Sequence, residues 1–271
     1  MPATISRVPV NGLDFHVEQS GSGDPLVLIH GGWGSTARWA LIVDGLAESF
    51  RVVNYDRRGH GQTEAGPVAP TRREQEDDLA ALIEELGVAP AHLVGSSFGG
   101  SIALSLAARR PDLVRSVSAH EPPLIDLVPN DPDVQRATDD LAYSVAIVEE
   151  GQPERAAAEF VERIVLGPGG WDMMPPEVQT MMIHNAPAFA GEQRDPKWAS
   201  ADLGGIACPV LLTRGDSSPV WFAPLMEAVS AELPAAEVAT IAGAGHVPHV
   251  THAAEYVELL TRFAEGVAAR E

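Results

Sequence analysis

The chain has 271 residues, of which 38 are acidic and 18 basic, so its net charge is near −20 at pH 7. A chain of this length can bury a sizeable core, and α/β folds of this size commonly form one core domain. The negative charge would repel nucleic acids and anionic membrane surfaces, so we expect neither as a partner. The single cysteine, Cys208, excludes an internal disulfide, and no apolar run approaches the roughly 20 residues that span a bilayer. We expect a cytoplasmic protein that acts on a small molecule, with its oligomeric state left open between monomer and homodimer.

The first part of the chain alternates predicted strands and helices. Residues 4–10 and 13–19 alternate apolar and polar side chains around Asn11-Gly12, which predicts an antiparallel hairpin. Short apolar runs predict buried strands at 26–29, 51–55, 91–94 and 114–119. Apolar residues at helical spacing predict helices at 36–49, 74–86 and 101–110.

Residues 122–202 break this alternation and contain no convincing strand. Helices are predicted there at 132–150, 153–166 and 175–184, so this segment has the pattern of an inserted helical cap. Strands at 210–213 and 237–241 then alternate with helices at 222–231 and 253–268. The predicted fold is therefore α/β, with a mostly parallel, doubly wound sheet of eight strands. Its core domain comprises residues 1–121 and 203–271, and residues 122–202 form the cap.

The segment Leu-Val-Gly-Ser-Ser-Phe-Gly-Gly at 93–100 joins a predicted strand to a predicted helix through a G-x-S-x-G turn. Such a turn strains its central residue and exposes the hydroxyl, which makes Ser97 the candidate nucleophile. Gly95 and Gly99 are needed because a Cβ there would collide with neighbouring backbone. The N-terminus of the following helix favours negative charge developing at this position.

A serine hydroxyl needs a base to activate it, and the base needs an acid to orient it. His246 is the candidate base and Asp216 the candidate acid, because both follow predicted strands at the sheet edge where α/β folds bind ligands. The sequence leaves alternatives for both roles, namely Glu121 or Asp126 for the acid and His249 or His252 for the base. The pair His120-Glu121 follows a strand beside the serine turn, so it could reach the pocket, but we expect a polar pair at the cap junction.

Taken together, these loops resemble the α/β-hydrolase family over nearly the whole chain, with the cap as the variable part. The matching motifs are His30-Gly31-Gly32, Asp56-Arg57-Arg58-Gly59-His60-Gly61, the Ser97 turn, Gly215-Asp216 and Gly245-His246. The resemblance implies an oxyanion hole formed by the backbone N–H groups of Phe98 and Gly32, with Trp33 as the alternative to Gly32. We expect His30 to order the loop that contains Gly32, and Arg57, Arg58 and His60 to brace the loop from Asp56.

The leading hypothesis is a serine hydrolase that cleaves a small or medium carboxylic ester or lactone through an acyl-enzyme on Ser97. We expect no cofactor and no metal, because no His, Cys or carboxylate cluster has metal-ligand spacing and no G-x-G-x-x-G follows a strand. Candidate substrate-binding residues are Trp33, Met182 and Trp198. The Met and aromatic residues of the cap could line an apolar pocket or, equally, pack against one another within the cap.

Two enzyme activities that use the same triad and one non-catalytic role remain as alternatives. The triad resembles that of C–C bond hydrolases and that of cofactor-free haloperoxidases or perhydrolases. The meta-cleavage C–C hydrolases usually carry an H-G-S-G-P-G-like loop, from which His-Gly-Gly-Trp-Gly-Ser at 30–35 departs. A non-catalytic, ligand-binding α/β-hydrolase is the third possibility, and the complete triad argues against it.

Overall fold

A computed structural model describes residues 3–66, 70–193 and 203–270, and in these residues the strands form an eight-stranded sheet ordered β1-β2-β4-β3-β5-β6-β7-β8. The strands are β1 (Thr4–Val10), β2 (Leu13–Ser20), β3 (Asp24–Ile29), β4 (Phe50–Tyr55), β5 (Ala91–Ser96), β6 (Val114–His120), β7 (Val210–Gly215) and β8 (Glu237–Ile241). The pairs β1–β2 and β2–β4 are antiparallel, and the other neighbours are parallel. The predicted fold class, a mostly parallel sheet of eight strands, is confirmed.

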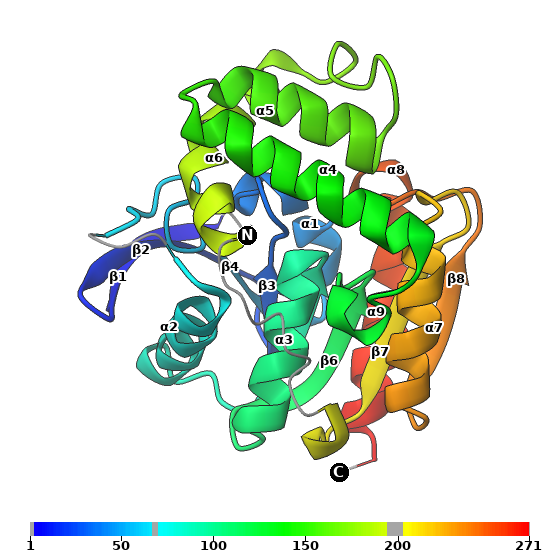
Figure 1. Cartoon of the computed structure of the whole chain (residues 1–271). Helices are drawn as coiled ribbons and strands as arrows, with labels where there is room; N and C mark the ends of the chain where they lie inside the picture. The colour runs from blue at the N-terminus through cyan, green and yellow to red at the C-terminus, as the bar shows by residue number, and fades with distance from the viewer. Residues whose placement is uncertain (1–2, 67–69, 194–202, 271) are drawn as a thin grey trace.

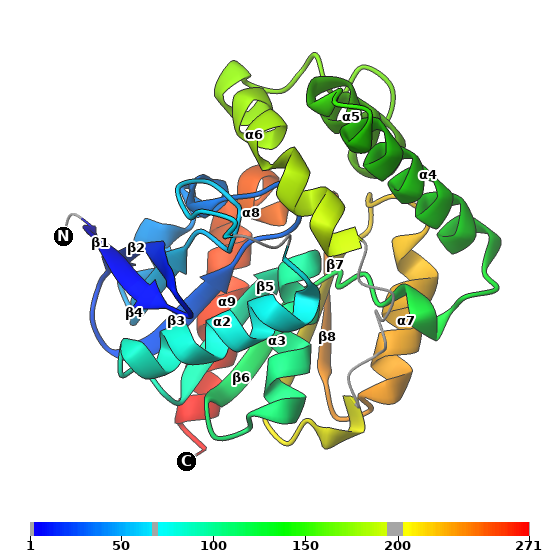
Figure 2. The same ribbon diagram turned by 60° about the vertical axis from the view of Figure 1, so that its left-hand side comes forward.

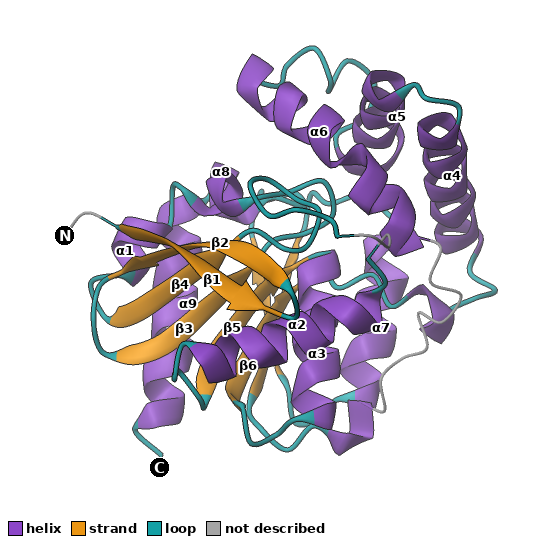
Figure 3. Ribbon diagram, turned by 90° about the vertical axis from the view of Figure 1, so that its left-hand side faces the viewer, coloured by secondary structure: helices purple, strands orange, loops and turns teal. Residues whose placement is uncertain are grey.

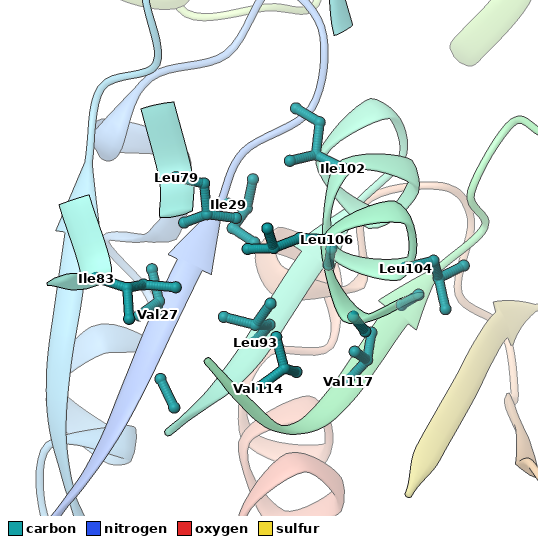
Figure 4. Packing of buried hydrophobic residues seen from close by; sticks show 14 of the residues in the cluster. Val27, Ile29, Leu79, Ile83, Leu93, Ile102, Leu104, Leu106, Val114 and Val117 are labelled. Atoms are coloured by element: carbon teal, nitrogen blue, oxygen red, sulfur yellow. The ribbon is translucent and has the colours of Figure 1, made fainter. Parts of the chain in front are cut away.

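Helices cover both faces of this sheet (Figures 1 and 2). The helices α2 (Arg72–Glu85), α3 (Phe98–Arg109) and α7 (Phe222–Glu232) pack on one face, and α1 (Val43–Leu46) and α9 (Ala253–Ala268) pack on the other. Alternate residues of β3 serve the two faces: Val27 packs with α2 and α3, whereas Leu26 packs with α1 and α9. Figure 4 shows Ile29 beside Leu79 and Val27 beside Ile83, both residues of α2. Burial on both faces explains why the central strands are continuous apolar runs.

The prediction of one helix over residues 36–49 is wrong. The chain forms a 3₁₀ turn at Thr36–Trp39 and then only the short α1. Gly45 lies within α1, and a Cβ there would come within 3.0 Å of Val257 in α9. The glycine therefore allows α1 to approach α9 closely, although glycine is a poor helix former.

Between β6 and β7 the chain forms α4 (Pro132–Glu149), α5 (Pro153–Phe160), a π-helical turn (Val161–Val165) and α6 (Pro176–Gln193), which we call the cap. The cap lies over the end of the sheet to which the parallel strands point (Figures 1 and 3). The third helix does not end at residue 184 as predicted, because α6 continues through Pro187 to Gln193. Its far half is largely buried, and this packing outweighs the helix hydrogen bond that a proline removes. None of the described helices is both long and apolar enough to cross a membrane.

Candidate active site

Ser97 occupies the sharp turn between β5 and α3, with φ +53° and ψ −124°. A Cβ added to Gly95 would lie under 3.0 Å from the backbone of Gly99, and one added to Gly99 would meet the carbonyl of Ile29 as closely. The glycines are therefore required for the close approach that the sequence analysis predicted. The Ser97 N–H donates to the carbonyl of His120 at 2.8 Å, which ties the turn to the end of β6.

His246 lies between β8 and the short helix α8 (Pro248–Thr251), and its ring stacks on Phe222 with centroids 4.2 Å apart. Its Nδ1 is 2.6 Å from Oε2 of Glu121. With Nδ1–H donating to this carboxylate, Nε2 is the nitrogen that can accept a proton. Ser97 and His246 border the same cavity, and no hydrogen bond joins these two described residues. Catalytic hydrogen bonds are often long without substrate and tighten in the reacting complex.

The carboxylate that hydrogen-bonds His246 is that of Glu121, whereas Asp216, the acid expected from the sequence, bonds elsewhere. Asp216 is exposed, and its Oδ1 accepts from the Gly243 N–H at 2.7 Å and from the Ser217 hydroxyl at 3.1 Å. Glu121 is fully buried directly after β6, and its Oε1 accepts from the Gly215 N–H at 3.0 Å. Asp216 is thus a turn residue that joins two loops, while Glu121 reaches His246.

Glu121 is held in its charged form. Burial alone would raise the pKa of its carboxyl, but the interaction with His246, chiefly its hydrogen bond, outweighs this effect and lowers the pKa to about 2. His120 lies beside it, with Nδ1 3.0 Å from the Thr213 hydroxyl and Nε2 3.5 Å from Glu121 Oε2. Burial lowers the pKa of His120 to about 3, so this imidazole is neutral. A charged carboxylate at His246 can stabilise the imidazolium that forms during acyl transfer.

One group of potential metal ligands emerges from this arrangement. The ligand atoms of His120, Glu121 and His246 lie within 4.8 Å of one another. The sequence analysis found no such cluster because His246 is distant from the other two along the chain. A metal held there would take the place of the hydrogen bond between His246 and Glu121, and we assign none.

Residues 30–35, which we call the oxyanion loop, leave β3 and pass beside Ser97. A Cβ on Gly31 would lie 3.1 Å from the Cβ of Ser97. Gly32 and Phe98, the two expected oxyanion donors, border the same cavity as Ser97, so their location is compatible with that role. His30 Nδ1 is 2.9 Å from the Gly31 carbonyl and its Nε2 accepts from a backbone N–H at 3.1 Å, as expected for a residue that orders the loop.

Backbone strain is concentrated at this site. Among the described residues other than glycine, four have a positive φ, and three of them are Trp33, Ser97 and Glu121. The fourth, Asn11, lies in the turn of the first hairpin. Residues held in such conformations cost about 1–3 kcal/mol each and cluster at functional sites. One strained residue therefore comes from each of the oxyanion loop, the turn at Ser97 and the loop at Glu121.

The cavity at Ser97 and His246 is small, about 40 Å³, with room for a few water molecules at most. Apart from Gln193 and the residues already named, its walls are apolar: Pro123, Ile125, Leu141, Phe160, Ile164, Val165, Phe189, Trp221 and Phe222. The sequence analysis left open whether the aromatic residues of the cap, Phe189 among them, line a pocket, because spacing alone does not tell which side of a cap helix faces the site. A larger hollow of about 550 Å³ lies between residues 59–65 and α6, and its lining includes neither Ser97 nor His246.

Two of the three expected substrate-binding residues lie in the described part of the chain, and both are buried in the cap cluster. Met182 is 5% exposed and packs in the core of the cap, and it does not border the cavity. Trp33 is 2% exposed and packs in the same cluster, against the rings of Phe160 and Phe189. Trp198 lies outside the described residues. For Met182 and Trp33 the structure favours packing over contact with substrate.

A family model described as the alpha/beta hydrolase family matches residues 26–259. The match covers most of the chain, and the protein belongs to the alpha/beta hydrolase family.

The chain is similar to several known members. It is 36% identical over 130 residues to the uncharacterized hydrolase YraK of Bacillus subtilis, covering 47% of this chain and 48% of the relative. It is 42% identical over 108 residues to 2-hydroxymuconate semialdehyde hydrolase of a Pseudomonas species, covering 38% of each chain. The matches thus span less than half the length of these curated relatives. Among solved structures, the enol-lactonase of Burkholderia xenovorans has a TM-score of 0.78 with 21% identity, over 97% of this chain and 100% of that one, which supports the fold alone.

Proposed function

We propose that the protein is a serine hydrolase that cleaves small or medium carboxylic esters or lactones through an acyl-enzyme on Ser97. The observation that carries the proposal is the meeting of a strained serine with a histidine bonded to a buried carboxylate at one cavity. An activated serine beside oriented N–H groups is the arrangement that acyl transfer requires. Membership in a family of hydrolases supports the same class of reaction.

Acylation follows from the roles of these groups. The Ser97 oxygen attacks the substrate carbonyl carbon while Nε2 of His246 takes the hydroxyl proton. Glu121, bonded to Nδ1, stabilises the imidazolium. The N–H groups of Phe98 and Gly32 bind the oxyanion. When the carbonyl re-forms, the ester C–O bond breaks and the alkoxide leaves as an alcohol with the proton from His246.

Deacylation repeats these steps with water. His246 takes a proton from a water molecule, and the resulting hydroxide adds to the acyl carbon. The bond to the Ser97 oxygen then breaks, and His246 returns its proton to the serine. The products are a carboxylic acid and the restored enzyme. A lactone opens by the same steps, its alcohol remaining joined to the acid.

The cavity walls support an apolar substrate. Burying a charged group against apolar side chains carries a large desolvation penalty, and these walls are formed chiefly by leucine, isoleucine, valine and aromatic side chains. Because the cavity is only about 40 Å³, cap side chains must move to admit an ester. Neutral esters with short or medium acyl chains are therefore the substrates we propose.

A fluorophosphonate probe tests the proposal directly, since it forms an adduct only with an activated serine. We expect an adduct on Ser97 by mass spectrometry, together with turnover of p-nitrophenyl esters. Ser97→Ala should abolish the adduct and lower turnover by about a millionfold, whereas Ser101→Ala, in the same segment, should keep both. A folded wild-type protein with neither adduct nor turnover would rule out the acyl-enzyme and favour a ligand-binding role.

Cleavage of a C–C bond is the second candidate. It is supported by the likeness to 2-hydroxymuconate semialdehyde hydrolase, although the match covers a minority of either chain. The same serine, histidine and acid serve it. Turnover of a vinylogous 1,5-diketone without turnover of aryl esters would place this activity first.

A further inference from the structure

One side of the cap helix α6 faces the oxyanion loop. Met181, Asn185, Phe189 and Glu192 follow one another at spacings of four, four and three residues, so they share a face of the helix. Each contacts the loop or its support. Met181 Sδ accepts from the Ser35 hydroxyl at 2.9 Å. The cap is therefore joined to this loop along about three helical turns.

Asn185 and Phe189 hold the strained part of the loop. The Asn185 Nδ2 donates to the carbonyls of Gly34 at 2.7 Å and Trp33 at 3.2 Å. The Phe189 ring stacks on Trp33 with centroids 4.4 Å apart. Trp33 has a φ of +62°, a conformation that persists in a non-glycine residue only when its surroundings enforce it. Two side chains of α6 supply that constraint.

Glu192 acts on the other end of the loop through Arg57. Its Oε1 is 2.5 Å from Arg57 Nη1, and both side chains are fully buried. Gln75 of α2 donates to the same oxygen at 3.0 Å. Arg57 in turn donates through Nε to the His30 carbonyl at 3.0 Å and through Nη2 to the Gly31 carbonyl at 2.8 Å. The Glu192 carboxylate thus holds in place the Arg57 guanidinium, which donates hydrogen bonds to the loop.

The bonds to the Gly31 carbonyl also orient the next N–H group. The peptide between Gly31 and Gly32 is planar and trans, so its N–H points opposite to its C=O. Arg57 and His30 hold that carbonyl from one side, and Gly32 borders the cavity. Fixing the carbonyl therefore fixes the direction of the Gly32 N–H, the expected oxyanion donor.

We propose that α6 keeps the oxyanion loop in its catalytic conformation, and that Glu192 is a positioning residue that acts through Arg57 on the Gly32 N–H. The inference rests on the proposed function for its catalytic consequence, but the bracing of the loop does not. This side of the cap then belongs to the catalytic framework, and movement that admits substrate takes place elsewhere in the cap.

Glu192→Gln tests the proposal, with Glu177→Gln as the matched control on the exposed first turn of the same helix. The amide keeps the size of the side chain and removes the charge that fixes Arg57. We expect kcat to fall about 10- to 100-fold in Glu192→Gln with KM within twofold, since misdirecting a single oxyanion donor acts on the transition state. Amide hydrogen exchange in a peptide spanning residues 31–35 should be at least tenfold faster. The control should match the wild type in both measurements.

Unchanged exchange and unchanged kcat in Glu192→Gln would overturn the proposal, and so would a rise in KM alone. If that variant does not fold, Asn185→Ala provides the same comparison at the Trp33 end of the loop, with faster exchange and lower kcat expected. A wild-type protein without ester turnover would refute the proposed function, while the exchange measurement would still decide whether α6 holds the loop.

Discussion

At the level of single residues, the pairing of β5 with β6 connects Ser97 to Glu121. Ser96 pairs with His120 in the parallel register, and the Ser97 N–H donates to the His120 carbonyl. Glu121 is the next residue, so the strand beside the nucleophile also carries the carboxylate. Only His246 must be brought from a distant part of the chain, and its stacking on Phe222 and bond to Glu121 fix its ring.

Exchanging each candidate acid for its amide separates the two assignments. Glu121→Gln should lower kcat for an ester by about 10⁴-fold, because an amide cannot stabilise the imidazolium and favours the wrong tautomer of His246. Asp216→Asn should leave kcat within about threefold, since among the described residues its exposed carboxylate accepts hydrogen bonds from Gly243 and Ser217 and none from His246. Steady-state kinetics on variants with wild-type circular dichroism would check this. The reverse order of losses would restore Asp216 as the acid.

At the level of elements, much of the site can be predicted from the sequence, because its loops directly follow strands that the sequence makes recognisable. The G-x-S-x-G turn predicts Ser97 because the close approaches at Gly95 and Gly99 exclude every larger residue. Buried strands appear as apolar runs, so the loops that follow them could be located, including those of Gly32 and His246. The acid could not be fixed in this way, since Glu121 and Asp216 both follow strands at the same edge of the sheet. Choosing between them requires the direction of a side chain, which spacing does not give.

The far half of α6 was unpredictable for a different reason. Pro187 is a helix-ending signal, and a helix through it becomes stable only when tertiary packing compensates for the lost hydrogen bond. Asn185, Phe189 and Glu192 all lie in that half, and all three are buried. A local pattern that argues for a loop thus concealed the residues that contact the oxyanion loop. The hydrogen-bond partners of Asn185 and Glu192 are distant in the sequence, in residues 31–35 and at Arg57.

The cap separates residues that shape the cavity from residues that shape the cap. Ile164 borders the cavity, whereas Met182 packs in the cap core. Ile164→Ala should shift the preferred acyl chain of p-nitrophenyl esters toward longer chains, because it removes three carbons from the wall. Met182→Ala should leave the preference unchanged and lower the free energy of unfolding by about 2–5 kcal/mol. Chain-length profiles and urea unfolding curves would check both, and a shifted profile in Met182→Ala would return that residue to the pocket.

For the whole molecule, two electrostatic effects act on a charged substrate at different ranges. The net charge near −20 produces a long-range field that repels anions before they reach the protein. The apolar walls of the cavity act only on contact, through the loss of hydration. Salt screens the first effect, because the Debye length falls from about 30 Å at 0.01 M to about 10 Å at 0.1 M. It leaves the second nearly unchanged.

These ranges predict how two matched esters will respond to salt. For an ester with a free carboxylate in its acyl chain, kcat/KM should rise several-fold between 10 mM and 300 mM salt, since screening weakens the repulsion during encounter. For the neutral ester of the same chain length, kcat/KM should change by less than about 1.5-fold. At the highest salt the anionic ester should remain the slower of the two, and the remaining difference measures its desolvation in the cavity. Equal rates at high salt would mean that the walls near Ser97 offer the carboxylate a partner.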